Sequence, residues 1–95
     1  MSHSPTLPTL LFYARDGCEL CAETRDVLQA ALESRVQRGD AIARVREVDI
    51  AADPELAARY GDLIPVLSLN GSELPLAMGR RAIDAFLDRV LPRLA

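Results

Sequence analysis

Hydrophobic and polar positions divide the chain into short apolar runs and two longer stripes with helical spacing. The run Thr9–Ala14 is apolar and rich in strand formers, which predicts a central strand buried on both faces. Over residues 18–36, apolar side chains recur every three or four positions opposite charged ones, which predicts an amphipathic helix. The apolar positions of that helix are Leu20, Thr24, Val27, Leu28, Ala31, Leu32 and Val36. A similar stripe over residues 82–91 predicts a last helix that ends before Pro92.

Between these two helices the chain holds further strand and helix signals. Residues 41–49 have the composition of a strand, but Arg44 and Arg46 interrupt its apolar side. Such charges are typical of an edge strand, which they protect from pairing with other chains. The Asp-Pro-Glu sequence at residues 53–55 combines a capping carboxylate, a proline in the first turn and an acid. It predicts the start of a short helix that runs to Tyr60.

A hairpin is the clearest turn signal in the chain. Residues 65–69 and 72–76 read as two strands, and Asn70-Gly71 between them tolerates the positive φ angles of a type I′ turn. The element order is therefore β-α-β-α-β-β-α. The first strand-helix-strand unit is expected to be parallel with a right-handed crossover. We predict an α/β fold in which a mixed four-stranded sheet is flanked by helices.

Length and charge limit the classes of function. Ninety-five residues fit one domain, and 49% hydrophobic residues are enough for a core. The net charge is −3, and the 11 basic residues are all Arg, which a GC-rich coding bias explains simply. We expect no nucleic-acid partner, because the chain has no net positive field to attract phosphates.

The ends of the chain suggest neither a membrane span nor a secretion signal. Residues 1–8 contain two prolines and little that can be buried, so we expect a flexible N-terminal tail. His3, the single histidine, lies in that tail, which disfavours Ser-His and Cys-His dyads. No apolar run approaches the length of a membrane span, and the first residues lack a basic region followed by an apolar one. We expect a cytoplasmic protein with no membrane partner.

Candidate chemistry lies in the two cysteines, Cys18 and Cys21, at the junction of the first strand and first helix. A helix start stabilises a thiolate through unpaired N–H groups and the positive end of the helix dipole. Arg15 in the preceding turn supports that effect, and Glu19 opposes it. Cys21 lies one turn further into the helix and is expected to be less exposed, so it is placed to resolve a mixed disulfide at Cys18.

Three other interpretations of the pair remain open. Free cysteines are commonly buried as apolar residues. A structural disulfide is disfavoured, since a bridge over so short a loop restrains the unfolded chain little and the cytosol is reducing. Zinc or an iron–sulfur cluster usually needs four ligands, so a metal site would require a second copy or external thiols.

Several motifs together resemble those of glutaredoxin-like proteins. They are the sequence from Leu11 to Cys21, Val48-Asp49-Ile50, Ile64-Pro65-Val66-Leu67, Asn70-Gly71 and Gly79. The resemblance covers residues 9–91 and implies a glutaredoxin-like domain over residues 9–95. It fits the short glutaredoxin branch of the thioredoxin fold, because too few residues precede Cys18 for the additional strand and helix of thioredoxins.

The resemblance also implies a substrate-binding site around the cysteines. Pro65 would follow a cis peptide bond and face the dithiol, and it would keep metals away from the thiolates. The backbone of Ile64 would pair with an extended peptide or with glutathione. Gly79 and the first amides of the last helix would receive a carboxylate, and Arg15 would contact the glycine carboxylate of glutathione.

Two departures from the family pattern affect this expectation. Glu19-Leu20 stands between the cysteines where typical glutaredoxins have Pro-Tyr or a close variant. Arg80 and Arg81 replace acids that hold the γ-glutamyl end of glutathione in the family. These arginines are unfavourable for the ammonium group of glutathione, and they also read as solvated residues on the outer face of the helix.

The sequence therefore predicts a thiol–disulfide oxidoreductase, with Cys18 as the nucleophile and Cys21 as the resolving thiol. We expect a monomer without a bound cofactor or metal, with a disulfide-containing protein or glutathione as partner. Electrons would come from glutathione, a possible co-substrate, or from a flavin-dependent reductase. One alternative is a non-catalytic binding module that uses the groove beside Ile64-Pro65. Another is a carrier that bridges a cluster between two copies.

Overall fold

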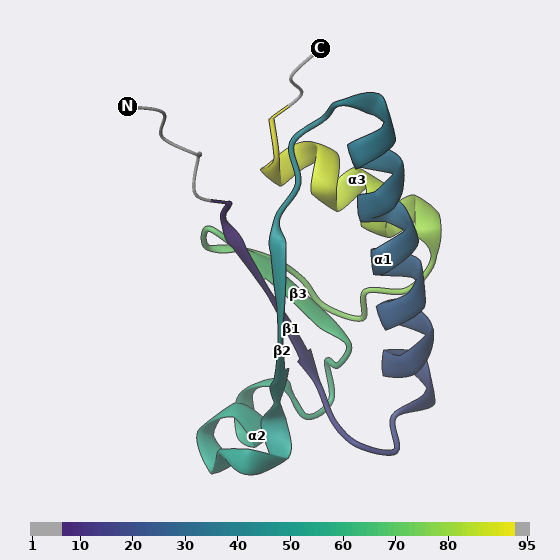
Figure 1. The fold of residues 1–95 in the computed structure, drawn as a ribbon. Coiled ribbons are helices and arrows are strands. Elements are labelled where there is room, and N and C mark those ends of the chain that lie inside the picture. The colour runs from purple at the N-terminus through teal and green to yellow at the C-terminus, as the bar shows by residue number, and fades with distance from the viewer. Residues whose placement is uncertain (1–6, 93–95) are drawn as a thin grey trace.

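The computed structural model describes residues 7–92, and its elements follow the predicted order (Figure 1). They are β1 (Thr9–Ala14), α1 (Glu19–Arg38), β2 (Arg44–Asp49), the 3-10 helix η1 (Ile50–Ala52), α2 (Pro54–Tyr60), β3 (Val66–Leu69), β4 (Ser72–Leu74) and α3 (Arg80–Val90). The four strands form one sheet in the order β2-β1-β3-β4. The predicted α/β architecture, a mixed four-stranded sheet flanked by helices, is confirmed.

Strand pairing follows from the connections between the strands. β1 and β2 pair in parallel across the α1 crossover, with Thr9 opposite Arg44. β3 pairs antiparallel with both β1 and β4. At the tip of the β3–β4 hairpin, Asn70 has a φ of 51° and Gly71 a φ of 84°. Positive φ at both central residues is the requirement of a type I′ turn, as the sequence predicts.

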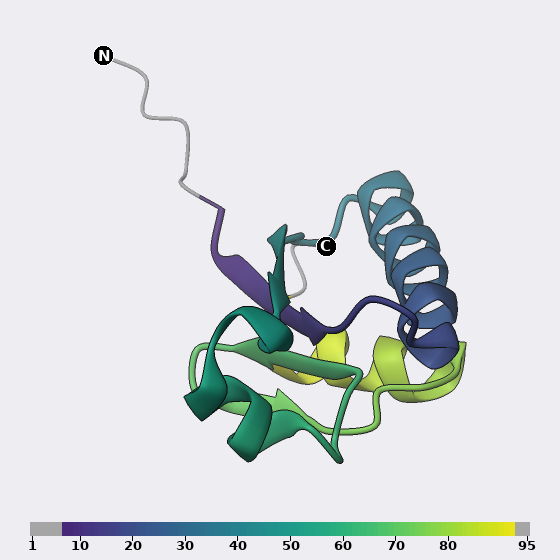
Figure 2. The ribbon, with the colours of Figure 1, turned by 90° about the horizontal axis from the view of Figure 1, so that it is seen from below.

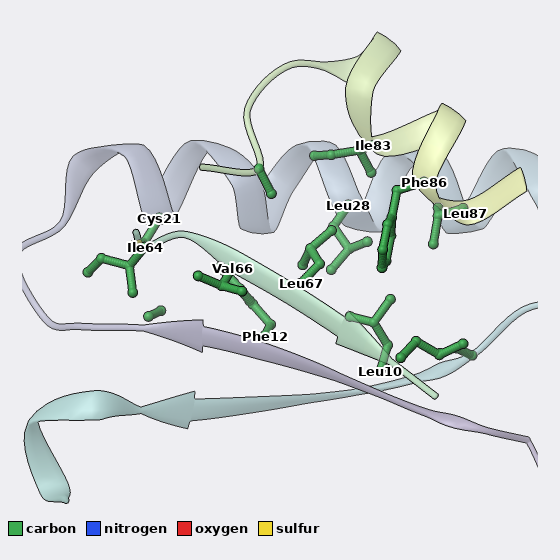
Figure 3. Packing of buried hydrophobic residues seen from close by; sticks show 14 of the residues in the cluster. Leu10, Phe12, Cys21, Leu28, Ile64, Val66, Leu67, Ile83, Phe86 and Leu87 are labelled. Atoms are coloured by element: carbon green, nitrogen blue, oxygen red, sulfur yellow. The ribbon is translucent and has the colours of Figure 1, made fainter. Parts of the chain in front are cut away.

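The core fills the space between one face of the sheet and the helices α1 and α3 (Figure 3). Paired residues of neighbouring strands point to the same face, so Phe12 of β1 and Leu67 of β3 lie together there. The largest fully buried apolar residues of the molecule, with Val66 on the second face beside Tyr13, are Leu10, Phe12, Leu28, Ile50, Val66, Leu67, Leu69, Ile83, Phe86 and Leu87. Both α1 and α3 are anchored on this face.

The second face of the sheet is covered by the short helix α2, which lies across β1 from α1 (Figure 2). Tyr60 at the end of α2 stacks on Tyr13 of β1, with ring centroids 4.2 Å apart. Leu11 and Tyr13 are only partly buried. The prediction that this strand is buried on both faces is therefore wrong for the second face, because a helix of seven residues covers little of it.

The apolar stripe predicted for α1 is buried only in its middle. Leu20 and Val36, at the two ends of the stripe, are exposed. Arg35 is buried instead, with 1% of its surface exposed. Its guanidinium donates to the carbonyl of Ala41 and to Asp88 Oδ1, and these acceptors come from outside the helix. Hydrophobic periodicity in α1 carries no sign of such partners.

Other differences concern the ends of elements. The strand predicted at 41–49 begins at Arg44, and it is an edge strand as expected. The strand predicted at 72–76 ends at Leu74. Of the predicted tail, residues 1–6 with His3 lie outside the described residues, and the Pro8 carbonyl accepts a hydrogen bond from Arg44 N–H. Within residues 7–92, no helix has both the length and the apolar character needed to cross a membrane.

Candidate functional site

A tight turn after β1 places Cys18 at the start of α1. Gly17 adopts a φ of 80°, and Cys18 N–H donates to the carbonyl of Arg15 at 3.3 Å. Cys18 is the N-cap residue, with extended backbone angles, and its Sγ accepts the N–H of Cys21 at 3.1 Å. The sulfur thus takes the place that a hydroxyl or carboxylate oxygen occupies at many helix starts.

Cys18 and Cys21 form a disulfide, and their Cα atoms are 5.2 Å apart. Cys21 has 0% of its surface exposed, whereas Cys18 is partly exposed. The expectation that Cys21 is the less exposed of the two is confirmed. The start of a helix favours a negative charge through its unpaired N–H groups and dipole, and Cys18 is the N-cap of a 20-residue helix. The partly exposed sulfur is therefore also the one at the helix start.

The segment that leads into β3 lies against the dithiol. Cys21 and Ile64 belong to the same buried cluster and lie at the same end of it (Figure 3). The peptide bond between Ile64 and Pro65 is cis. Ile64 N–H donates to the carbonyl of Tyr60 at 3.1 Å. Its carbonyl accepts no hydrogen bond within residues 7–92, so of the two backbone groups only this acceptor is open to a ligand.

A second loop, which leads into α3, is tied to both the proline segment and α1. Ala77 N–H donates to the carbonyl of Pro65 at 2.7 Å, and the Thr24 hydroxyl donates to the carbonyl of Ala77. Gly79 follows two residues later as the N-cap of α3, with a φ of 85° and no side-chain cap. The supporting role of Thr24 was not predicted from the sequence, although a threonine within an apolar stripe is a usable signal for a buried hydrogen bond.

Arg15 lies on the other side of the dithiol. It lines a hollow of about 400 Å³ together with Asp16, Gly17, Cys18, Glu19, Ala22 and Arg25. Within residues 7–92, the guanidinium of Arg15 makes no hydrogen bond or ion pair, and the residue is exposed. Arg25 is held by Glu47 through two hydrogen bonds of 2.7 and 3.0 Å, which raise the pKa of Arg25. Arg15 is thus the cation of this hollow that remains available to a carboxylate.

The arginines at the start of α3 differ in their contacts. Arg80 donates to the carboxylate of Asp84 at 3.0 Å and to the hydroxyl of Ser34 at 2.9 Å. Arg81 is exposed. Both arginines are exposed, but Arg80 is bonded to α1, so the solvated interpretation does not describe its contacts fully, and the first amides of α3 follow Gly79.

Beneath the site, a polar contact supports the second face of the sheet. The Tyr60 hydroxyl donates to Glu73 of β4, and its ring stacks on Tyr13. Burial raises the pKa of Tyr60 well above its usual value, and the hydrogen bond to Glu73 adds to this effect. No local pattern indicates this pair, because Tyr60 and Glu73 are 13 residues apart in the chain and only the fold brings them together.

Most of the predicted site residues gather at one end of the molecule. The ends of β1 and α2 and the starts of α1 and β3 meet there, and the loop over residues 75–79 is joined to them through Ala77. Arg15 lines the hollow beside Cys18, while Cys21 and Ile64 share one end of the core. We call this end the dithiol edge. The start of α3 after Gly79 lies further along α1, since Arg80 donates to Ser34 in the second half of that helix. Within residues 7–92, no group of three or more His, Cys, Asp or Glu side chains is arranged to hold a metal ion.

Comparison with known proteins now identifies the family. The family described as Glutaredoxin-like domain (DUF836) matches residues 9–90, which is well over half of the chain. The chain belongs to the glutaredoxin-like domain family. The resemblance inferred from the sequence motifs is thereby confirmed. No curated protein matches this glutaredoxin-like chain.

Solved structures show the same fold. An X-ray structure of target protein XcR50 from X. campestris is 32% identical, covers 84% of this chain and 96% of its own, and has a TM-score of 0.67. The solution NMR structure of protein Ne2328 from Nitrosomonas europaea is 25% identical, covers 90% and 98%, and has a TM-score of 0.62. A malarial protein with 16% identity covers 93% and 100% with a TM-score of 0.58, and supports the fold alone.

Proposed function

We propose that this glutaredoxin-like protein is a thiol–disulfide oxidoreductase that acts as a monomer in the cytoplasm. The observation that carries the proposal is the asymmetry of the cysteine pair. Cys18 is partly exposed at the start of α1, and Cys21 is buried one turn further on, within bonding reach of it. A reactive thiol must be reached by substrate, whereas a resolving thiol has only to reach its partner.

The exchange has two balanced steps. The Cys18 thiolate attacks one sulfur of a substrate disulfide, so that a mixed disulfide forms and the other substrate sulfur leaves as a thiolate that takes up a proton. Cys21 then gives up its thiol proton and attacks Cys18 Sγ. The second substrate thiolate leaves, and the Cys18–Cys21 disulfide forms. Two electrons from two glutathione molecules, or from a flavin-dependent reductase, restore the dithiol.

The groups around the pair have supporting roles in this proposal. The carbonyl of Ile64 accepts a hydrogen bond from the backbone of the bound partner, while Pro65 fills the space beside the sulfurs. Arg15 meets a carboxylate of the partner in the hollow beside Cys18. The amides after Gly79 provide a second place for a carboxylate.

An equilibrium titration of the cysteine pair against glutathione redox buffers tests the proposal. After quenching, free thiols are alkylated, and the number of alkylated cysteines per protein is determined by mass spectrometry. We expect one two-electron transition within the cytosolic range, roughly −320 to −220 mV. Thiols that remain unreactive in the native protein would contradict the proposal and favour a binding module at Ile64-Pro65. Visible absorbance and a dimer after anaerobic purification would favour the cluster carrier.

Two matched variants separate the roles of the cysteines. With Cys21→Ser, the mixed disulfide at Cys18 cannot be resolved and accumulates with glutathione disulfide. With Cys18→Ser, the remaining thiol is buried and stays free under the same conditions. Equal trapping in both variants would show that the two cysteines do not have distinct roles.

A further inference from the structure

Large hydrophobic side chains are exposed around the dithiol. Within residues 7–92, seven large hydrophobic residues are exposed, namely Leu7, Leu20, Val36, Val45, Leu63, Leu76 and Met78. Four of them, Leu20, Leu63, Leu76 and Met78, belong to the segments that form the dithiol edge, and each has between 39% and 48% of its surface exposed. We call these four the apolar rim. Single exposed hydrophobic residues are normal, but a group of them around one site marks an interaction surface.

Hydrogen bonds connect members of the apolar rim to the proline segment and to α1, the two elements that lie next to the dithiol. Leu63 directly precedes Ile64, and its carbonyl accepts the N–H of Leu76 at 2.8 Å. Met78 follows Ala77, whose N–H is bonded to Pro65 and whose carbonyl is bonded to the Thr24 hydroxyl.

Leu20 completes the apolar rim from the helix side. It stands between the two cysteines, one helical turn before Thr24, and residues four apart lie on the same face of a helix. Because Thr24 contacts Ala77, this face of α1 is turned toward the loop that carries Leu76 and Met78. The rim therefore borders the dithiol from α1, from the proline segment and from the loop before α3.

The backbone of Leu76 strengthens the case for a function. Its φ is 49°, in the left-handed region that Asn and Gly adopt more readily than leucine. Its N–H is fixed by the carbonyl of Leu63, so the conformation is set by the surrounding structure. Leucine is thus kept where its backbone is strained and its side chain is exposed, and such outliers often mark binding sites.

We propose that the apolar rim selects polypeptide disulfides whose reactive cysteine is flanked by apolar side chains, in preference to glutathione disulfide. This inference rests on the proposed oxidoreductase function and names its substrate class. A partner sulfur at Cys18 brings the neighbouring partner side chains onto the rim, where apolar ones are removed from water. Glutathione has two carboxylates, an ammonium group and no apolar side chain, so it gains nothing from this surface.

Single-turnover kinetics test the inference. The reduced protein is mixed with the disulfide of a blocked Leu-Cys-Leu peptide, the disulfide of a Ser-Cys-Ser peptide, or glutathione disulfide. In each reaction the protein dithiol loses two electrons and two protons, and the probe becomes two thiols. Samples are quenched in acid, alkylated and analysed by mass spectrometry. Each rate is divided by the rate at which dithiothreitol reduces the same probe. We expect the Leu peptide to react about tenfold faster than the Ser peptide.

A matched pair of triple variants assigns this preference to the rim. The rim variant carries Leu63→Gln, Leu76→Asn and Met78→Gln, and leaves Leu20 in place because it lies between the cysteines. The control variant carries Leu7→Gln, Val36→Gln and Val45→Gln, the three remaining exposed hydrophobic residues. They lie far from the dithiol, before β1, near the end of α1 and in β2. Urea unfolding verifies that both variants fold.

We expect the ratio of Leu-peptide to glutathione-disulfide rates to fall at least about fivefold in the rim variant and to persist in the control variant. Equal rates for the Leu and Ser peptides, or a preference that survives in the rim variant, would overturn the inference while leaving the dithiol chemistry intact. Absence of reaction with all three probes would instead overturn the proposed function.

Discussion

The two ends of the molecule are held together in different ways. At the dithiol edge, exposed leucines and a methionine surround the cysteines, and single hydrogen bonds such as that from Thr24 to Ala77 connect the segments. At the opposite edge, where β1 and β2 begin and α1 and α3 end, one buried cation joins three segments. Arg35 donates to the carbonyl of Ala41 at 2.7 Å, to Asp88 at 2.6 Å and to the carbonyl of Pro92 at 3.3 Å.

This contrast shows how a small domain combines stability with an accessible reactive site. The opposite edge uses a fully enclosed charge, which is stable only because it is paired and hydrogen-bonded. Gly39 closes the same end of α1 in a left-handed conformation, and its N–H donates to carbonyls of the last turn. The dithiol edge leaves apolar side chains in water, so it contributes less to stability and more to recognition.

Arg35→Met is expected to weaken the opposite edge more than any other substitution proposed for the molecule. The variant keeps apolar bulk but leaves the Ala41 and Pro92 carbonyls without the Arg35 donor and removes the ion pair between Arg35 and Asp88. Because the Arg35 side chain is 1% exposed, we expect the free energy of unfolding to fall by about 3 kcal/mol. Urea unfolding of the oxidised protein measures the change.

Arg38→Met is the matched control, since Arg38 lies in the same last turn and pairs with Asp40 while its side chain is 52% exposed. An exposed pair contributes at most about 1 kcal/mol. Equal losses in the two variants would show that burial of Arg35 does not strengthen the opposite edge.

Thr24→Val tests the main polar link of the dithiol edge. Valine has nearly the same shape but lacks the hydroxyl, so the buried carbonyl of Ala77 loses its donor. We expect a loss of about 2 kcal/mol in the free energy of unfolding. Thr24→Ser keeps the hydroxyl and is expected to lose less, and a larger loss with serine would contradict the importance of the hydrogen bond.

Local patterns in the sequence predicted most of the fold and the centre of the site. Asn70-Gly71 specifies its own turn, and the proline after Asp53 starts α2 through effects confined to neighbouring residues. The position of the cysteines at the start of α1 follows from the same kind of local signal. The fold then brings the predicted residues Ile64 and Pro65 to them.

Contacts between distant residues account for what the sequence did not reveal. Arg35 is buried because Ala41, Asp88 and Pro92 converge on it, and periodicity in α1 contains no trace of them. Leu20 continues the apolar stripe of α1 but is exposed, because it lies at the margin of the buried face, which runs through Cys21, Thr24, Leu28, Ala31 and Arg35. Hydrophobic spacing identifies a face, whereas burial depends on how far the neighbouring element reaches.

Tyr60→Phe is expected to change how the stability of the protein depends on pH. The variant loses the hydrogen bond to Glu73, which we expect to cost about 1 kcal/mol near neutral pH. The pKa of Tyr60 in the folded protein is raised above the usual value of 10.0, which applies to the unfolded chain. Below pH 10.0, both states therefore keep the phenol proton, and the hydrogen bond contributes fully to the free energy of unfolding. Above that pH, the unfolded chain loses the proton first, so the free energy of unfolding declines as pH rises.

Urea unfolding of the oxidised protein at about pH 8 and about pH 11 measures this dependence without interference from thiol titration. The phenylalanine variant is expected to show a shallower decline than the wild type. Parallel declines would mean that Tyr60 does not contribute to the alkaline loss of stability.

Leu76→Asn has the smallest expected effect, and its sign is the informative quantity. Asparagine accepts a φ of 49° more readily than leucine, so the variant relieves backbone strain while losing a side chain that is already half exposed. We expect the free energy of unfolding to rise by roughly 0.5 kcal/mol, whereas the control Leu63→Asn, at a residue without positive φ, gains nothing. If both variants lose stability equally, the leucine is not strained in this position. A gain at residue 76 together with a weaker preference for the Leu-flanked peptide would mean that the dithiol edge retains leucine for recognition at the expense of stability.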